Sequence, residues 1–589
     1  MKEWKSKSVK TRHATLVWLA TLICLVGIRG ACAQERAEVT PQAPGGIRDN
    51  RSADAAGGHR IAGVVVDAAT GVAIAGAELS IAEGIADVEV TADEEGRFAF
   101  AGLEPGKYAV AATAQGYVQE RYKQHQGYST AMAVGPGLDA EHMVFRLHRQ
   151  AVVTGVVTDE RGEVVRKAQV MLFADQHGAG KDAVQLLSQT ETDDLGAYRF
   201  AHLQAGKYYV AVTAHPWYAQ TAVAEGSATS EEEGAASRSN HFSRKSDPKL
   251  DVVYATTFYP GVTDDHSAGE LQVSAGETQT ADVRLQAVLS THIRLTNAPV
   301  ATADNGTSFA VGAMQPVFGS AMNMGLSLVA GPVAPGVYEV GGLPPGEVTL
   351  TLTENRNGQE WENRTIHTNV SDGESIDAAG TGAVANVQGR VLLAESGAVG
   401  PQGQVVLINK ERQTVARRLQ KDGTFTFQGV EAGRYEVSVN LGGGDEDYVE
   451  RMTATGAKVS STELTIDEAG EVRLVIRMGR GWGQVKGVVK GGGKVEAGVM
   501  VLLVPSSEEN LERDARMDQT DSDGTFTLGR ILPGRYVLMA IEAGWELDWR
   551  EAGALAPYRE KGQVVEVRAN EVKEVAVEAE AKKKAESGE

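Results

Sequence analysis

Aromatic side chains near the C-terminus offer the clearest means of binding a ligand in this sequence. Trp545 and Trp549 lie four residues apart, Asp548 and Arg550 flank Trp549, and Tyr558 follows within the stretch "GWELDWREAGALAPY". An aromatic ring combines an apolar face with neighbouring polar groups, which suits stacking on a sugar ring. We therefore predict a carbohydrate platform here, with a polysaccharide or envelope glycan as the partner.

A second candidate platform is "YATTFYPG", which supplies Tyr254, Phe258 and Tyr259. The alternative for Phe258 and Tyr259 is that they cover a sheet edge. Two tryptophans, Trp217 and Trp545, recur at the repeat position that Tyr117 occupies near the N-terminus. An aromatic residue at one repeat position favours packing under a loop over ligand binding.

The sequence lacks the common motifs of hydrolytic catalysis. No H-x-x-E zinc pair and no G-x-S-x-G elbow occurs. The acidic turn Asp521-Ser522-Asp523-Gly524 resembles part of a calcium loop, and Asp193-Asp194 stands at the same place in an earlier repeat. Calcium needs more oxygen ligands than these turns supply, and Asp-Gly is common in turns that join strands. We expect no enzyme, no catalytic residue, no metal and no cofactor.

The N-terminus is typical of an export signal. Five basic residues among the first 12 precede an apolar segment, Ala14 to Val26, and Ala31-Cys32-Ala33 forms an A-x-A cleavage site. We predict cleavage between Ala33 and Gln34, which gives a periplasmic, outer-envelope or extracellular protein without a membrane span. The alternatives are a lipid on Cys32 and an uncleaved anchor.

Composition limits what the exported chain can bind. Both cysteines, Cys24 and Cys32, lie in the signal, so residues 34–589 can form no disulfide. Residues 1–33 hold six Lys or Arg and one Glu; 51 basic and 77 acidic residues remain, a formal net charge of −26. This charge argues against binding nucleic acid or an anionic membrane.

One phrase recurs along the chain. "DGTFTFQGVEAGRYEVSV", from Asp422, has close counterparts from Glu95, Leu195 and Asp523. Apolar residues alternate on both sides of a glycine-containing turn, which predicts two strands joined as a hairpin. The Gly-x-Tyr after the turn has the form of a tyrosine corner, in which the hydroxyl donates to nearby backbone.

Counting the phrase gives five units, with turn glycines at Gly106, Gly206, Gly346, Gly433 and Gly534. The third is degenerate, because Val348 replaces the tyrosine. Low apolar content also predicts a disordered insertion. The predicted organisation is: signal peptide 1–33, disordered linker 34–59, sandwich one 60–150, sandwich two 151–288 with the insertion 224–249, degenerate sandwich three 289–382, sandwich four 383–480, sandwich five 481–579 and charged tail 580–589.

Units of about 100 residues with short alternating strands predict an all-β protein, a tandem array of five antiparallel β-sandwiches. The pattern also resembles the carboxypeptidase regulatory-like domain, most fully at Gly63-Val64-Val65-Val66-Asp67, Gly96-Arg97-Phe98-Ala99-Phe100 and Leu103-Glu104-Pro105-Gly106-Lys107-Tyr108. The resemblance is good in all units except the third. It implies a transthyretin-like, Ig-like sandwich of the starch-binding-like group, used as a non-catalytic appendage or in tandem arrays.

Two functions follow as expectations. The first is a non-catalytic, exported repeat protein that binds carbohydrate or another ligand at the cell envelope. The second is a structural spacer whose partner is another envelope protein. Exposed clustered aromatics favour the first function, and aromatics buried within the units favour the second.

Overall fold

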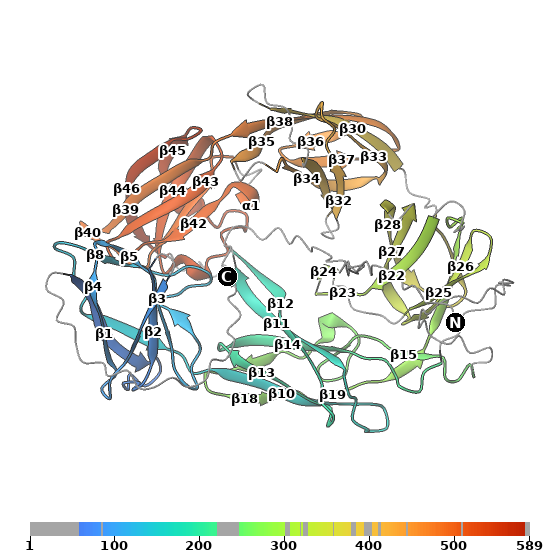
Figure 1. Ribbon diagram of the computed structural model, residues 1–589, viewed down its shortest axis with the longest axis horizontal. Helices are drawn as coiled ribbons and strands as arrows, with labels where there is room; N and C mark the ends of the chain where they lie inside the picture. Colours follow the sequence, from blue (N-terminus) through green and yellow to red (C-terminus); the bar gives the residue numbers. More distant parts are fainter. Residues whose placement is uncertain are drawn as a thin grey trace, which may run out of the picture. The chain divides into compact units, whose positions relative to one another are not determined.

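The computed structural model describes residues 58–83, 86–178, 180–220, 247–300, 307–318, 320–321, 328–356, 359–378, 384–393, 403–409, 414–442, 446–507 and 511–582. The predicted signal peptide and its cleavage site lie outside these residues, as do nearly all of the predicted linker and insertion. Strands dominate the described chain, as Figure 1 shows, and its α-helices are short, at Leu511–Asp514 (α1) and Ala556–Arg559 (α2). The predicted all-β fold is confirmed.

The strands form five sets along the chain, which we call the first to fifth sandwich; the boundaries predicted from sequence stay predictions. The first contains β1 (His59–Asp67), β2 (Glu78–Glu83), β3 (Ala86–Thr91), β4 (Arg97–Leu103), β5 (Gly106–Tyr108), β6 (Val110–Thr113), β7 (Glu120–Arg121), β8 (Met132–Val134) and β9 (Met143–Leu147). The second contains β10 (Ala151–Thr158), β11 (Gln169–Gly178), β12 (Lys181–Glu191), β13 (Ala197–Leu203), β14 (Gly206–Thr213), β15 (Val252–Tyr254), β16 (Thr257–Phe258), β17 (Leu271–Val273), β18 (Thr278–Thr280), β19 (Val283–Arg284) and β20 (Ala287–Leu289).

The remaining three sets follow in the same way. The third contains β21 (Thr291–Thr296), β22 (Thr307–Met314), β23 (Pro316–Val317), β24 (Ser320–Ala321), β25 (Val329–Ala334), β26 (Val337–Leu343), β27 (Gly346–Arg356), β28 (Gln359–Val370) and β29 (Glu374–Asp377). The fourth contains β30 (Val384–Leu393), β31 (Gln404–Asn409), β32 (Thr414–Arg418), β33 (Thr424–Glu431), β34 (Gly433–Asn440), β35 (Asp447–Thr455), β36 (Lys458–Ser460), β37 (Glu463–Ile466) and β38 (Gly470–Arg480). The fifth contains β39 (Gly483–Gly491), β40 (Lys494–Val495), β41 (Met500–Pro505), β42 (Arg516–Gln519), β43 (Thr525–Ile531), β44 (Gly534–Glu542), β45 (Gln563–Val567) and β46 (Val572–Ala581).

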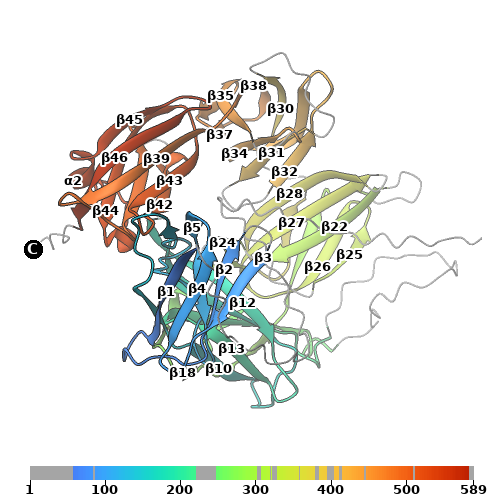
Figure 2. The same ribbon diagram turned by 60° about the vertical axis from the view of Figure 1, so that its left-hand side comes forward.

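All five sets share one topology. The first strand of each set is the central strand of one sheet. On one side it pairs antiparallel with the strand before the repeated turn, and on the other it pairs parallel with a strand late in the set, as in the order β4-β1-β9. The strand after the turn pairs with the second strand of the set, as in β2-β6 and β31-β34. In Figure 2 the two sheets of the fourth set, β30-β38-β35 and β31-β34-β37, face each other.

This topology shows that the predicted hairpin is wrong. β33 pairs with β30 in one sheet, whereas β34 pairs with β31 and β37 in the other. The turn before Gly433 therefore carries the chain from one sheet across to the facing one. A hairpin and a crossing turn bury the same alternate residues, because inward side chains recur every second position in both arrangements.

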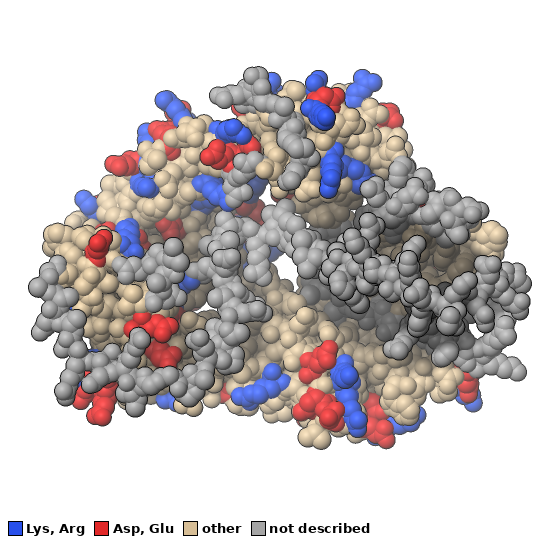
Figure 3. All heavy atoms as spheres, viewed as in Figure 1, with Lys and Arg blue, Asp and Glu red and all other residues tan. Residues whose placement is uncertain are grey.

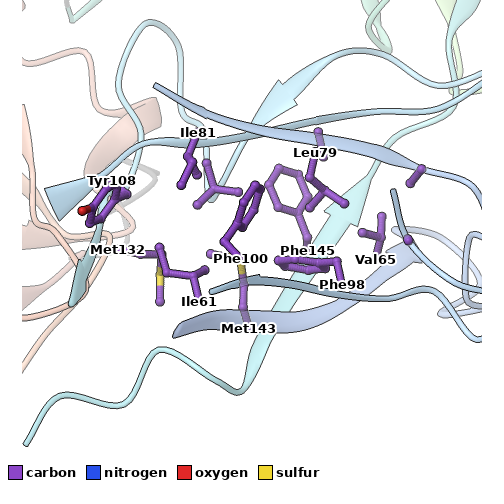
Figure 4. Close-up of a cluster of buried hydrophobic side chains, with 14 of the residues drawn as sticks. Ile61, Val65, Leu79, Ile81, Phe98, Phe100, Tyr108, Met132, Met143 and Phe145 are labelled. Atoms are coloured by element: carbon purple, nitrogen blue, oxygen red, sulfur yellow. The ribbon is translucent and has the colours of Figure 1, made fainter. Parts of the chain in front are cut away.

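Each set has its own hydrophobic core. In the first, Phe98 and Phe100 of β4 meet Leu79 and Ile81 of β2 and Phe145 of β9, as Figure 4 shows. These side chains are at most 5% exposed. Equivalent clusters lie in the other four sets. Burial of apolar area between the two facing sheets, at about 25 cal/mol per Å², stabilises each sandwich. No disulfide contributes, because residues 34–589 contain no cysteine.

Near the C-terminus the structure differs from the sequence-based expectation. β46 continues to Ala581, two residues into the predicted tail that begins at 580. β46 runs parallel to β39 along Gln484–Lys490 and then pairs with β44 at Ala540–Glu542. Because β39 and β44 belong to different sheets, β46 joins the two sheets of the fifth sandwich. Within this strand Val575, Val577 and Ala579 stand at every second position and pack against the core of the sandwich.

Candidate interdomain contact site

The fifth sandwich is apolar on both faces of one sheet. All six residues of β41 are buried, and so are six of the nine in β44. Alternate side chains such as Val501 and Leu503 enter the inner core, whereas Met500 and Leu502 point to the opposite face. A strand buried on both faces needs a second covering layer. The continuous apolar run "MVLLVP" indicates this in the sequence.

The covering layer is the segment that contains the predicted C-terminal platform. After β44, Ala543 adopts a left-handed conformation and a single 3-10 turn, η4 (Gly544–Glu546), folds the chain back. Trp545, Trp549 and Tyr558 then pack on Met500, Leu502, Met539 and their neighbours. They are 6%, 4% and 3% exposed, respectively.

These rings therefore offer no open face for stacking on a sugar, and the expected exposed platform is not found at these positions. The physical reason is the apolar outer face beneath them, which recruits the nearest large apolar side chains. Their predicted carbohydrate-binding role stays a prediction. The expectation that Trp545 packs under a loop agrees with its burial.

A loop of the first sandwich covers Trp545 from the other side. The His125 ring stacks on the indole, with centroids 5.0 Å apart and planes 4° from parallel, and the Tyr128 ring lies 5.7 Å away. The Gln126 amide donates to the Trp545 carbonyl oxygen at 2.9 Å. Trp545 is thus held between its own sheet and a loop about 420 residues earlier in the chain.

The turn that leads into β43 makes polar contacts with the same loop. The Ser522 N–H donates to the Ala131 carbonyl oxygen at 2.9 Å, and the Ala133 N–H donates to Ser522 Oγ at 2.7 Å. Gln519 Nε2 donates to the Lys123 carbonyl oxygen at 2.7 Å and to Thr130 Oγ1 at 2.8 Å. Because Gln519 and Thr130 are only 2% and 1% exposed, these mutual contacts satisfy groups that are removed from water.

Asp521 and Asp523, the residues that resemble a calcium loop, take part in this contact. Asp521 Oδ1 accepts the Ala131 N–H at 3.0 Å, and Asp521 Oδ2 lies 2.6 Å from Lys107 Nζ. Asp523 Oδ1 accepts the Thr525 N–H at 3.1 Å, as a turn-forming aspartate does. Both carboxylates are engaged by groups of the chain itself.

The second sandwich touches the same segment. At Gly180, which has φ of +78°, an added Cβ would lie 2.3 Å from the Trp549 ring, so only glycine permits this approach. The Arg550 N–H donates to the Gly180 carbonyl oxygen at 3.2 Å. His177 Nε2 lies 3.2 Å from the Leu547 carbonyl oxygen. Trp549 therefore contacts the connection between β11 and β12.

The other predicted platform is also interior. Tyr254 and Phe258 are 5% and 2% exposed, and Tyr259 is half-buried. β16, which contains Phe258, is itself an edge strand and pairs with β14. The Phe258 ring lies 5.5 Å from that of Phe318, a residue of the turn between β23 and β24 in the third sandwich.

Polar contacts surround this second aromatic group. The Phe318 N–H donates to Asp265 Oδ2 at 2.6 Å, and Thr256 Oγ1 donates to Gln315 Oε1 at 2.7 Å. The Tyr254 hydroxyl donates to Glu160 Oε2 at 3.3 Å. Burial, followed by the Glu160 charge, raises the pKa of Tyr254, so its hydroxyl stays protonated and remains a donor.

Trp217 differs from the expectation that it packs under a loop. Its side chain is 79% exposed, and its ring meets Tyr218 edge-on with centroids 5.7 Å apart. The neighbouring Tyr218 is anchored instead, because its hydroxyl bonds to Glu160 and Arg161 lies over its ring. Aromatic residues at the same repeat position can therefore be buried, as Trp545 is, or exposed, as Trp217 is.

Sequence reasoning missed His125, Gln126, Tyr128 and Phe318. Their roles depend on which surfaces meet, and the repeat pattern carries no signal for that. The glycine at 180 and the apolar run of β41 were usable signals.

Among the described residues, one group of possible metal ligands lies close together, Asp264, Asp265 and His266, with ligand atoms within 4.8 Å. Asp264 caps a 3-10 turn and Asp265 binds Phe318, so hydrogen bonding accounts for both.

The family comparison bears on the first two sandwiches. The family model described as the carboxypeptidase regulatory-like domain matches residues 60–139 and 152–237. The chain contains two carboxypeptidase regulatory-like domains. They fall on the first and second sandwiches, where the resemblance predicted from the sequence is confirmed. In both domains the motif tyrosine closes a corner: Tyr108 donates to the Glu104 carbonyl oxygen and Tyr208 to that of Gln204.

Solved structures similar to this chain include three bacterial proteins. They are the Bacillus anthracis TIE protein (15% identity, 72% of this chain and 68% of that one, TM-score 0.15), the minor pilin GBS52 of Streptococcus agalactiae (14%, 35% and 100%, 0.18) and the pilus protein RrgB of Streptococcus pneumoniae (10%, 74% and 99%, 0.14). TM-scores this low support no comparison of domain arrangement or of function between these proteins and this chain. No curated protein matches the sequence. In the described part of the chain, no helix is long and apolar enough to cross a membrane.

Proposed function

We propose that this chain is a non-catalytic, exported scaffold in which sandwiches pack on one another through their non-repeating aromatic residues. The observation that carries the proposal is the burial of Trp545, Trp549 and Phe258, each against a residue of another sandwich. Aromatic side chains contribute large buried areas and commonly anchor interfaces. Export is proposed from the N-terminal signal pattern, and an envelope protein is the expected partner.

The polar contacts support a defined rather than a loose association. Around Trp545, buried groups of the first and fifth sandwiches satisfy each other's hydrogen bonds, and Lys107 pairs with Asp521. Buried polar groups left unpaired are costly, so each such pair favours this one docking geometry. On the face shown in Figure 3, Lys and Arg side chains are interspersed with Asp and Glu side chains.

Hydrogen exchange of residues 34–589 tests the proposal. Replacement of Trp545 by alanine removes the ring between His125 and Met500, so we expect faster exchange at the Ala131 and Ala133 amides. Exchange in the core of the first sandwich, such as at Val65, should be unchanged. Trp217→Ala, which removes an exposed ring, is the matched control. Unchanged exchange at Ala131 and Ala133 in Trp545→Ala would contradict the proposal.

Carbohydrate binding has one observation in its favour, the exposed ring of Trp217 beside Tyr218. A pull-down of residues 34–589 with insoluble polysaccharides tests it against Trp217→Ala and a Trp545→Ala, Trp549→Ala double variant. Binding that only Trp217→Ala abolishes would establish a sugar site there. Binding lost in the double variant with folding intact would place the site in the fifth sandwich after all, and absence of binding would reject carbohydrate as the ligand.

A further inference from the structure

A hollow of about 300 Å³ lies in the fifth sandwich, beside the Trp549 segment. Its walls come from α1, from the turns after Trp549 and from α2. Leu511, Leu555 and Ala556 supply apolar surface, whereas Arg550 and Arg559 supply positive charge. All lining residues belong to this sandwich, and two of them, Trp549 and Arg550, also contact Gly180 of the second sandwich.

Each of the two arginines uses its Nη1 in a hydrogen bond, and its Nε–H is left without one. Arg550 Nη1 donates to Glu512 Oε1 at 2.6 Å, and Arg559 Nη1 donates to the Pro505 carbonyl oxygen at 3.4 Å. The Nε atoms of both are buried and have no hydrogen-bond partner among the described residues. In a guanidinium group the Nε–H and the second Nη point in the same direction, so this edge is the fork that binds a carboxylate through two hydrogen bonds.

The surroundings hold one of these forks in place. The Arg550 guanidinium lies 5.4 Å from the centroid of the Trp549 ring, and Trp549 is itself only 4% exposed. Stacking on a fixed aromatic face restricts the guanidinium plane. Buried polar groups without partners are uncommon in folded proteins and often mark the place of a missing water, ion or ligand.

We propose that this hollow binds a small molecule with a carboxylate group and an apolar body. The carboxylate accepts hydrogen bonds from the Nε edges of Arg550 and Arg559, and the apolar body lies against Leu511 and Leu555. Glu512 and Glu551 also line the hollow and balance the two positive charges. Recognition therefore rests on the geometry of the forks at short range rather than on long-range attraction of anions.

Titration of residues 34–589 with sodium benzoate, followed by saturation-transfer NMR, tests the proposal. We expect saturable binding of benzoate and none of benzyl alcohol, which keeps the ring but lacks the carboxylate. Arg559→Lys retains the charge and loses the fork, so the affinity should fall about tenfold. Arg568→Lys, at an exposed arginine outside the hollow, is the control and should bind as the parent does.

Glu512→Gln gives a second, opposite readout. Glu512 is 79% exposed at its side chain and competes for Arg550, so its neutralisation should leave the fold intact and raise benzoate affinity about threefold. Equal affinities of the parent and Arg559→Lys would overturn the proposal, as would equal binding of benzyl alcohol. Absence of saturation at about 10 mM benzoate, a weak-binding limit, would do so as well.

Discussion

At the scale of single residues, four tyrosines close the same corner. The hydroxyl groups of Tyr108, Tyr208, Tyr435 and Tyr536 each donate to the carbonyl oxygen four residues earlier, at 2.7–3.0 Å. The local Gly-x-Tyr pattern was enough to predict this bond, because donor and acceptor are close in sequence. The third sandwich, with Val348 at this position, lacks the hydroxyl and buries the smaller side chain completely.

Tyr208→Phe measures how much the hydrogen bond of one tyrosine corner contributes to the unfolding free energy. Loss of the hydroxyl leaves the Gln204 carbonyl oxygen without its donor, so we expect the second sandwich to lose about 1 kcal/mol of unfolding free energy. Hydrogen exchange of its core amides, such as that of Val210, measures the change. Tyr209→Phe is the neighbouring control, because its hydroxyl makes only a 3.5 Å contact with Glu270. An equal effect of both variants would argue against the corner.

Asp518 gives the fifth sandwich a pH-dependent stability. Burial raises the pKa of its carboxyl group to about 6, above the model-peptide value of 3.8, even though the N–H groups of Thr527 and Gln519 donate to it. The folded protein therefore binds this proton more tightly than the unfolded chain does, and the contribution to stability grows as pH falls from 7 towards 4.

Asp518→Asn should remove that dependence. We expect the parent to gain about 2 kcal/mol relative to the variant between pH 7.5 and pH 4.5, from a raised pKa of this size. Denaturant unfolding of the fifth sandwich at the two pH values, followed by tryptophan fluorescence, measures the difference. Parallel pH profiles for the two proteins would show that Asp518 does not titrate in this way.

At the scale of elements, the sequence predicted strands well and their pairing poorly. Phe425 and Phe427 were correctly placed on a buried face, since alternation fixes the inward side. Whether β34 pairs with β33 or lies in the opposite sheet depends on residues far apart in the sequence. The alternation of apolar residues does not distinguish the two arrangements. The glycine in the first strand of the first, second and fifth sandwiches was a usable clue, because it marks a close approach of the neighbouring backbone.

Gly487→Ala tests that close approach in β39. An added Cβ would lie 2.4 Å from the Val575 carbonyl oxygen and 2.8 Å from the Phe526 ring, so β39 and its parallel neighbour β46 would have to separate. We expect a loss of about 2 kcal/mol in unfolding free energy for the fifth sandwich. Gly529→Ala, in the adjacent β43 with open space around it, should change stability much less. Thermal unfolding of both variants distinguishes these outcomes.

At the scale of the whole molecule, the repeats and the regions between them carry different information. Composition and repetition predicted five sandwiches with separate cores, and each of the five sets of strands contains an inner hydrophobic cluster. The sequence offered Trp545 and Phe258 as candidate sugar-binding rings, with packing under a loop favoured for Trp545 and cover of a sheet edge as the alternative for Phe258. In the structure both are buried against other sandwiches. Such contacts arise from residues hundreds of positions apart, and no local pattern encodes them.

A designed disulfide tests the central claim, that the first and fifth sandwiches are packed on each other. Residues 34–589 contain no cysteine, so Ala131→Cys with Ser522→Cys introduces one possible pair. The Ser522 N–H donates to the Ala131 carbonyl oxygen at 2.9 Å, so the two backbones are in direct contact, and a disulfide requires Cα atoms no more than about 7 Å apart.

The measurement is the number of free thiols in monomeric protein after mild oxidation. The control pair is Ala131→Cys with Glu566→Cys, at an exposed residue of β45. Our account predicts rapid loss of both thiols in the first pair and retention in the control. Retention of free thiols in the first pair, with the protein folded, would contradict it.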